Sequence, residues 1–85
     1  MPMKKYLVDV NLPAAGTHLD VFLPPDKQIG EVIQLLVALA ESQSGGSYQG
    51  TDNAILLDAR TGEAYTLTDT VTEAGIRNAS RLILI

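Results

Sequence analysis

Apolar and polar side chains alternate along two stretches near the start of the chain. Residues 6–12 place an apolar residue at every even position, and residues 18–23 place one at every odd position. A period of two is typical of a β-strand with one buried face. The Pro-Ala-Ala-Gly segment at 13–16 favours a turn, and Gly16 can adopt a positive φ. The pattern therefore predicts a β-hairpin.

The apolar spacing changes to three and four residues from Ile29 onward, which predicts an amphipathic helix of about four turns. Its buried face would consist of Ile29, Val32, Ile33, Leu36 and Ala40. Pro24-Pro25 ends the preceding strand, and Asp26 is expected to cap the helix N-terminus. Leu35 and Leu39 widen the apolar sector. They therefore form a possible second interface, either for a partner or for self-association.

The second half of the chain carries weaker signals. Residues 42–53 have no periodicity and are rich in glycine and hydroxyl side chains, which indicates a flexible loop. Short strands are expected at 54–58 and 64–67, with a turn between them. Residues 81–85 form the closing strand.

A single turn is expected between residues 68 and 76. Asp69 would cap it, because a carboxylate at that position can accept backbone N–H bonds. Gly75 would end it in the left-handed conformation.

The resulting order is strand, strand, helix, strand, short strand, strand. We expect an α+β fold with a mixed sheet of four to five strands and one long helix packed on one face. The first and last strands could pair in parallel, because the helical crossover lies between them. With 85 residues, the chain is expected to form one domain, 1–85.

Composition narrows the classes of function. The chain has no cysteine, which excludes thiol catalysis, cysteine zinc sites and disulfide bonds. Its net charge is −4, and its six basic residues are spread along the sequence, which argues against nucleic acid as a partner. The longest apolar run, 35–40, is too short for a membrane span, and the N-terminus does not fit a signal peptide. A cytoplasmic protein is expected.

Candidate catalytic residues are few. His18 is the only histidine, and without a second histidine or a cysteine it is interpreted as a solvent-facing strand residue. Ser42, Ser44 and Ser47 lie in a glycine-rich stretch that lacks the lysine and the spacing of a phosphate-binding loop. The acidic residues match no calcium loop. We therefore expect no catalytic residue, metal or cofactor.

The remaining signal is an apolar surface. If the period of two continues, the side chains facing the helix are Leu19, Val21, Leu23, Ile55, Leu57, Leu82 and Leu84. The opposite face would then present Phe22, Leu56, Ile83 and Ile85. Contiguous exposed apolar side chains usually mark a contact surface, so these four residues form a predicted protein-binding patch. On this hypothesis, Leu56→Asp should abolish binding and leave the fold intact.

Three parts of the chain resemble known proteins. The end of the chain resembles the closing segment of ubiquitin-like proteins, in Leu67-Thr68-Asp69, then Ile76, then Ser80 to Leu84. Residues 16–24, 29–36 and 73–78 resemble the small bacterial proteins of the YukD/EsaB type, which are encoded with type VII secretion systems. That family often has Gly-Asp where this chain has Ala79-Ser80. The closing turn also resembles the N-terminal domain of EccD, a membrane component of mycobacterial type VII machines.

The resemblance implies a ubiquitin-like β-grasp fold and a function in binding. Ubiquitin is recognised through an apolar patch on the outer side of its sheet. The sequence ends at Ile85 without a Gly-Gly tail, so we expect no conjugation. The implied function is a non-conjugated accessory or regulatory protein of a bacterial type VII system, acting by protein–protein docking. Its partners would be components of that machine, which could recruit it to the inner face of the cell membrane.

Alternatives remain open at this stage. The chain could be a non-catalytic β-grasp subunit of a multicomponent enzyme such as an oxygenase. It could be the cytosolic ubiquitin-like domain of an EccD-type membrane protein. A sulfur carrier or protein modifier would need a C-terminal glycine, so that reading requires a natural chain that continues past Ile85. A homodimer is also compatible with the sequence.

Overall fold

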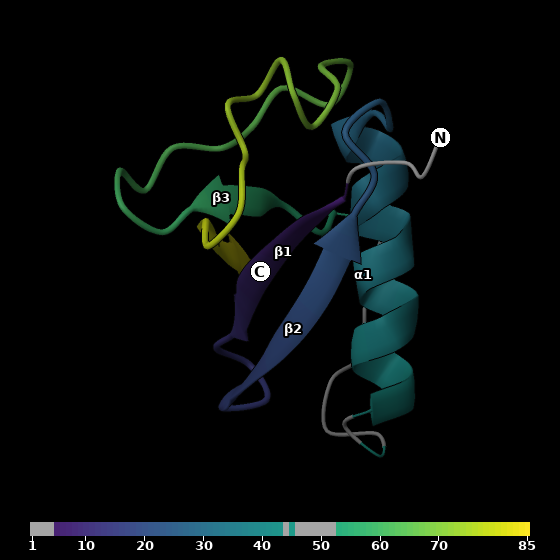
Figure 1. The fold of residues 1–85 in the computed structure, drawn as a ribbon. Helices are drawn as coiled ribbons and strands as arrows, with labels where there is room; N and C mark the ends of the chain where they lie inside the picture. Colours follow the sequence, from purple (N-terminus) through teal and green to yellow (C-terminus); the bar gives the residue numbers. More distant parts are fainter. Residues whose placement is uncertain (1–4, 44, 46–52) are drawn as a thin grey trace.

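The structure is a computed structural model that describes residues 5–43, 45 and 53–85. Its elements follow the order β1 (Tyr6–Leu12), β2 (Thr17–Leu23), α1 (Ile29–Gln43), β3 (Leu56–Asp58) and β4 (Arg81–Leu84). Figure 1 shows the strands on one side and α1 running along the other. The predicted hairpin, long helix and closing strand are confirmed.

The four strands form one mixed sheet in the order β2-β1-β4-β3. β1 pairs antiparallel with β2 and parallel with β4, and β4 pairs antiparallel with β3. The parallel pairing of the first and last strands is therefore confirmed. The short strand expected at 64–67 is wrong: this segment contributes only an isolated bridge, between Leu57 and Ala64.

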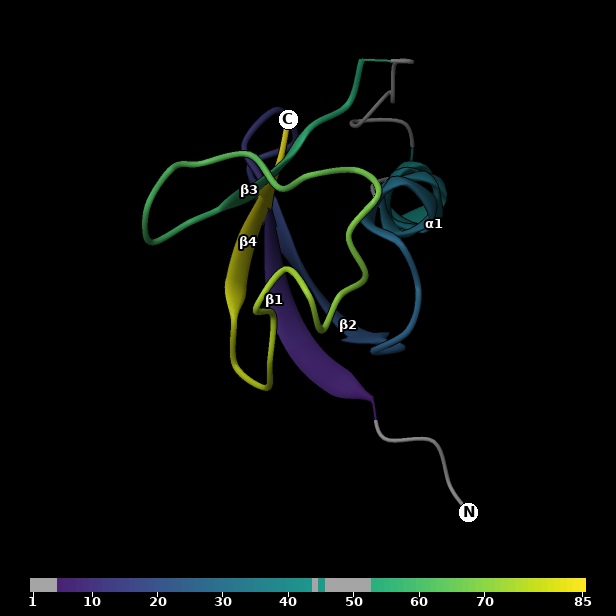
Figure 2. The ribbon, with the colours of Figure 1, turned by 90° about the horizontal axis from the view of Figure 1, so that it is seen from above.

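The helix covers one face of the sheet, as Figure 2 shows with α1 viewed end-on. The even residues of β1 from Val8 onward and the odd residues of β2 from Leu19 onward point toward α1 and are buried. They meet the helical face formed by Ile29, Val32, Ile33, Leu36 and Ala40. Val71 and Ile76, from the segment before β4, complete the core. Burial of this apolar surface is the main stabilising contribution to the fold.

The helix begins at Ile29, so the prediction that Asp26 caps it is wrong. The first amides of α1 donate instead to backbone carbonyls of a distant loop. The N–H of Ile29 donates to the Asp69 carbonyl at 2.8 Å, and that of Gly30 donates to the Leu67 carbonyl at 2.9 Å. These bonds satisfy donors that a helix start leaves without an intrahelical partner. They also tie the helix to the segment that leads into β4.

The segment before β4 is a turn capped by Thr70 and Glu73. The Thr70 N–H donates to Glu73 Oε1 at 2.9 Å, and the Glu73 N–H donates to Thr70 Oγ1 at 3.1 Å. This reciprocal pair is a capping box, in which Glu73 supplies the carboxylate that we expected from Asp69. The backbone of Gly75 has a φ of +82°, the left-handed conformation predicted for it.

Two further sequence predictions are resolved only in part. Ser42 lies in the last turn of α1, so its assignment to a loop is wrong. Ser44 and Ser47 lie outside the described residues. Within the described part of the chain, no helix combines the length and apolar character needed to cross a membrane.

Candidate protein-binding face

The face of the sheet that points away from α1 is the part of the fold available for contact. Odd positions of β1 and β4 and even positions of β2 point to this outer face, because side chains alternate along a strand. Its residues, in the strands or next to them, are Leu7, Asp9, Asn11, His18, Asp20, Phe22, Ile55, Leu57, Arg81, Ile83 and Ile85.

Apolar residues gather on the β3–β4 half of this face. Leu57 lies directly opposite Ile83 in the antiparallel pair. Ile55 and Ile85 exchange two backbone hydrogen bonds, of 2.9 and 3.0 Å, so they also lie opposite each other. Ile55 is 44% exposed and Ile85 is 51% exposed, whereas Leu57 and Ile83 are half-buried. We call these four residues, Ile55, Leu57, Ile83 and Ile85, the β3–β4 patch.

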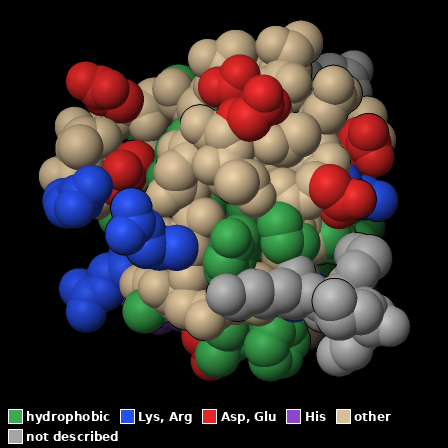
Figure 3. All heavy atoms as spheres, turned by 45° about the horizontal axis from the view of Figure 1, so that its top comes forward, with side chains coloured by type: hydrophobic (Ala, Val, Ile, Leu, Met, Phe, Trp, Pro, Cys, Tyr) green, Lys and Arg blue, Asp and Glu red, His purple; other side chains and the backbone are tan. Residues whose placement is uncertain are grey.

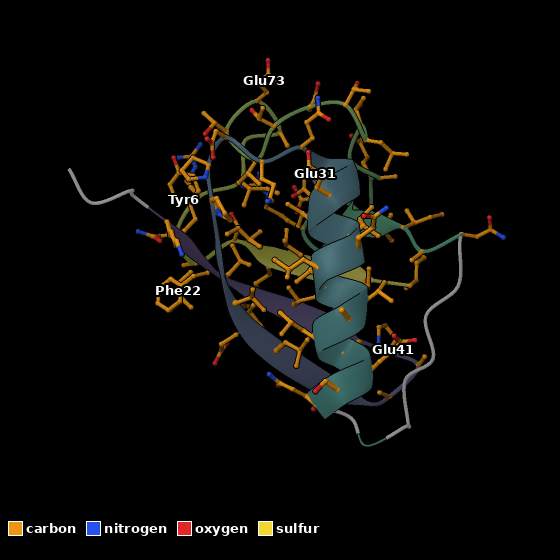
Figure 4. The ribbon with its side chains drawn as sticks, turned by 90° about the vertical axis from the view of Figure 1, so that its right-hand side faces the viewer. Tyr6, Phe22, Glu31, Glu41 and Glu73 are labelled. Carbon is orange, nitrogen blue, oxygen red and sulfur yellow. The ribbon has the colours of Figure 1, made fainter. Side chains whose placement is uncertain are left out.

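Phe22 lies at the opposite end of the outer face. It pairs with Leu7 on β1, and it is the most exposed large apolar side chain of the described residues, at 60%. Figure 4 shows its ring projecting away from α1. Along β1, Leu7 and Asn11 are four residues apart, about 13 Å, and Asn11 is the register partner of Ile83. The predicted patch is therefore divided, with Phe22 at one end and Ile83 and Ile85 at the other.

Polar side chains separate the two ends. Asp9 lies between Asp20 and Arg81 in the register, and His18 lies beside Asn11. His18 Nδ1 is 3.2 Å from Asp9 Oδ1. The interpretation of His18 as a solvent-facing strand residue agrees with its exposure, but the sequence did not indicate that it has a carboxylate partner across the hairpin.

The placement of Leu56 in the exposed patch is wrong. Leu56 is 1% exposed and lies opposite Leu84, which is also buried. Its neighbours Ile55 and Leu57, expected to face the helix, lie on the outer side instead. Leu56→Asp would place a carboxylate in the core and destabilise the fold, so this variant cannot test binding.

The second predicted interface, on α1, is small. Leu35 is 40% exposed, but Leu39 is half-buried and packs against the core. A surface groove beside α1 is lined by Ile33, Val37 and Leu67, among others. These residues do not form a continuous exposed apolar face with Leu35, so the outer face of the sheet is the stronger candidate.

Titratable groups give little sign of catalysis. The described residues contain no group of three or more His, Cys, Asp or Glu side chains that could hold a metal ion. Burial raises the pKa of the Tyr65 phenol above its ordinary value of 10.0, and the nearby Asp58 carboxylate adds to the rise while Arg60 opposes it. Tyr65 therefore keeps its proton at neutral pH.

Comparison with known proteins identifies the fold. Neither a protein-family model nor a protein of curated function matches the chain. Among solved structures, the ubiquitin-like domain of EccD5 from Mycobacterium xenopi is similar, with a TM-score of 0.80 and 17% identity over 96% of this chain and 93% of that chain. This is a ubiquitin-like β-grasp fold.

Two further β-grasp structures show how widely this fold is used. A ubiquitin from Caldiarchaeum subterraneum has a TM-score of 0.76 and 18% identity, over 96% of this chain and 92% of that chain. A chain of the toluene 4-monooxygenase HD complex has a TM-score of 0.76 and 11% identity, over 95% of this chain and 96% of that chain. At such identities the likeness establishes the fold, and function has to be argued from the residues of this chain.

Proposed function

We propose that this β-grasp chain is a non-catalytic accessory protein of a type VII secretion machine that works by docking onto other proteins of the machine. The observation that carries the proposal is the β3–β4 patch. Four aliphatic side chains lie together on a sheet face whose centre is polar. A contiguous exposed apolar patch with a polar rim is the usual composition of a protein-binding surface.

The choice of a secretion machine has two supports. Residues 16–24, 29–36 and 73–78 resemble the YukD/EsaB proteins encoded with such systems. The ubiquitin-like domain of EccD1, a type VII secretion system protein of Mycobacterium tuberculosis, is similar in structure over 98% of this chain and 99% of that chain. Both are consistent with a free accessory protein or with the ubiquitin-like domain of a larger secretion protein.

Affinity capture from an extract of the native cells tests the proposal. The wild-type chain should retain type VII secretion components, and Ile83→Asp should retain at least tenfold less, because a charge in the patch must be desolvated on binding. Phe22→Asp is the matched control, because it places the same charge on the same face outside the patch. This control should bind like the wild type.

Thermal unfolding of all three proteins separates binding from stability. The proposal requires Ile83→Asp to remain folded at the temperature of capture. It would be refuted if wild-type capture lacked type VII components, or if a folded Ile83→Asp chain captured them as well as the wild type.

A second candidate is a small subunit of a multicomponent oxygenase. The similarity to a chain of the toluene 4-monooxygenase complex favours it, because that chain has nearly the same length and fold. Stable co-purification with a large catalytic chain, in place of secretion components, would favour this candidate over the first.

A further inference from the structure

A hollow of about 590 Å³ lies at the end of the sheet where β3 stops and β4 begins. The turn after β3 forms one wall, and the loop that leads into β4 forms the other. Arg60 comes from the turn, Arg77 from the loop and Arg81 from the start of β4. These are all three arginines of the chain, and they line the same hollow, which we call the arginine pocket.

The charge of the arginine pocket opposes that of the molecule. The chain has a net charge of −4, yet three of its six basic residues line this one hollow. Figure 3 shows most of the visible Lys and Arg side chains on one side of the molecular surface, with a further basic side chain on the opposite side. Among the described lining residues, one is acidic, Asp58. Its Oδ1 accepts a hydrogen bond from the Arg60 backbone N–H at 2.8 Å. Three arginines and one aspartate thus line the same hollow.

The arginines are also available for a ligand. The two ion pairs among the described residues join His18 to Asp9 and Lys27 to Glu31, and neither involves an arginine. Arg60, Arg77 and Arg81 are all exposed. Guanidinium groups bind carboxylates through paired N–H···O bonds, and such bonds are stronger than those between neutral groups.

The backbone holds the loop wall in place. The Arg77 N–H donates to Ser80 Oγ at 3.0 Å, and the Ala79 N–H donates to the Leu7 carbonyl at 2.8 Å. Ala79 has a φ of +69°, a left-handed conformation that costs a non-glycine residue about 1–2 kcal/mol. A loop that keeps this strain is fixed by its surroundings, so the backbone positions of Arg77 and Arg81 are set before any ligand binds.

The arginine pocket adjoins the β3–β4 patch. Arg81 and Ile83 are two residues apart on β4 and point to the same face of the sheet. A polypeptide seated on the patch could therefore continue into the pocket. We propose that the arginine pocket binds an acidic segment of the protein partner that docks on the β3–β4 patch, an inference that rests on the proposed function.

Charge distribution favours an acidic polypeptide over a phosphate. The three arginines come from two backbone segments, the turn at Arg60 and the stretch from Arg77 to Arg81, which suits several spaced carboxylates better than one compact dianion. Asp58 within the hollow would repel a doubly charged phosphate more strongly than a singly charged carboxylate.

A titration of the ¹⁵N-labelled chain with a hexaglutamate peptide at low salt tests the inference. The peptide should shift the amide signals of residues 58–60 and 75–81. Arg60→Gln/Arg77→Gln should weaken its apparent affinity at least fivefold. Lys5→Gln/Lys27→Gln lowers the net charge by the same amount outside the pocket, and it should change the affinity less than twofold. Unchanged amide signals elsewhere in the spectrum show that each variant is folded.

Three results would overturn the inference: no shifts at the pocket, equal weakening by the two double variants, or tighter binding of inorganic phosphate than of hexaglutamate at the same residues.

Ile83→Ser separates this test from that of the docking function, because it removes patch surface without adding charge. It should bind hexaglutamate like the wild type. If hexaglutamate does not bind at the arginine pocket while Ile83→Ser still impairs partner capture, the inference about the pocket is wrong and the docking function stands. If hexaglutamate binds while capture is unaffected by Ile83→Ser, the docking function is contradicted.

Discussion

The β1–β2 hairpin and the β3–β4 half of the sheet differ in what fixes their side chains. β1 and β2 pair along seven residues and are neighbours in sequence. β3 has only three residues. Backbone hydrogen bonds from other segments of the chain hold β3 and the residue before it. The Tyr65 N–H donates to the Leu56 carbonyl at 3.0 Å, and the Ile55 N–H donates to the Ile85 carbonyl at 2.9 Å.

This difference explains which orientations could be read from the sequence. In the hairpin, the alternation of apolar and polar residues specifies the buried face directly. Residues 54–57 are all apolar, so their pattern is compatible with either orientation. The pairing of Leu56 with Leu84 decides the orientation of β3, because it places both side chains on the core side.

The largest expected effect sharpens this contrast within β3. Leu56→Ala should lower the free energy of unfolding by about 3 kcal/mol, since it removes a fully buried side chain and leaves a cavity. Leu57→Ala, the matched change at the next position, should cost about 1 kcal/mol or less. Urea denaturation of the two variants measures both values. A larger loss for Leu57→Ala would reverse the assignment of β3.

A smaller effect tests the connection between β3 and β4. Thr70→Ala removes the hydroxyl that accepts the Glu73 N–H bond, and it should destabilise the chain by about 1 kcal/mol. Thr68→Ala removes the same atoms two residues earlier from an exposed position, and it should stay within about 0.5 kcal/mol of the wild type. Thermal denaturation compares the two. Equal effects would show that the capping box contributes nothing specific.

Sequence reasoning succeeded where structure is local. The helical face from Ile29 to Ala40, the hairpin and the positive φ at Gly75 each depend on neighbouring residues. The start of α1 depends on distant residues instead, because its first amides donate hydrogen bonds to the carbonyls of Asp69 and Leu67, about forty positions away. Asp26 was therefore a reasonable but wrong cap. The Thr70-to-Glu73 spacing, by contrast, was a readable capping-box signal that the sequence interpretation missed.

The candidate surfaces show the same limit. Phe22, Ile83 and Ile85 lie on the predicted outer face, but only strand order and register show that Phe22 is remote from the other two. The arginines look dispersed in sequence, at positions 60, 77 and 81. They share one hollow because the antiparallel pairing of β3 with β4 brings the turn and the loop together.

The smallest effect concerns Tyr65, beside the turn after β3. Its pKa is raised above 10.0 in the folded chain, chiefly by burial, so the folded state holds the phenolic proton to a higher pH than the unfolded state. Its contribution to stability is present below pH 10.0 and is lost as the pH rises through the folded pKa. The difference between the ultraviolet titration curves of wild type and Tyr65→Phe isolates this ionisation. A midpoint at or below 10.0 would contradict the burial argument.

Mapping the bound partner on the surface tests the central claim most directly. The ¹⁵N-labelled chain should be titrated with the purified type VII component that affinity capture identifies. The docking account predicts that Ile55, Leu57, Ile83 and Ile85 show the largest amide shifts or broadening, while the outer side of α1 around Leu35 is unchanged. Perturbation confined to α1, or to Leu7 and Phe22 at the far end of the sheet, would contradict it.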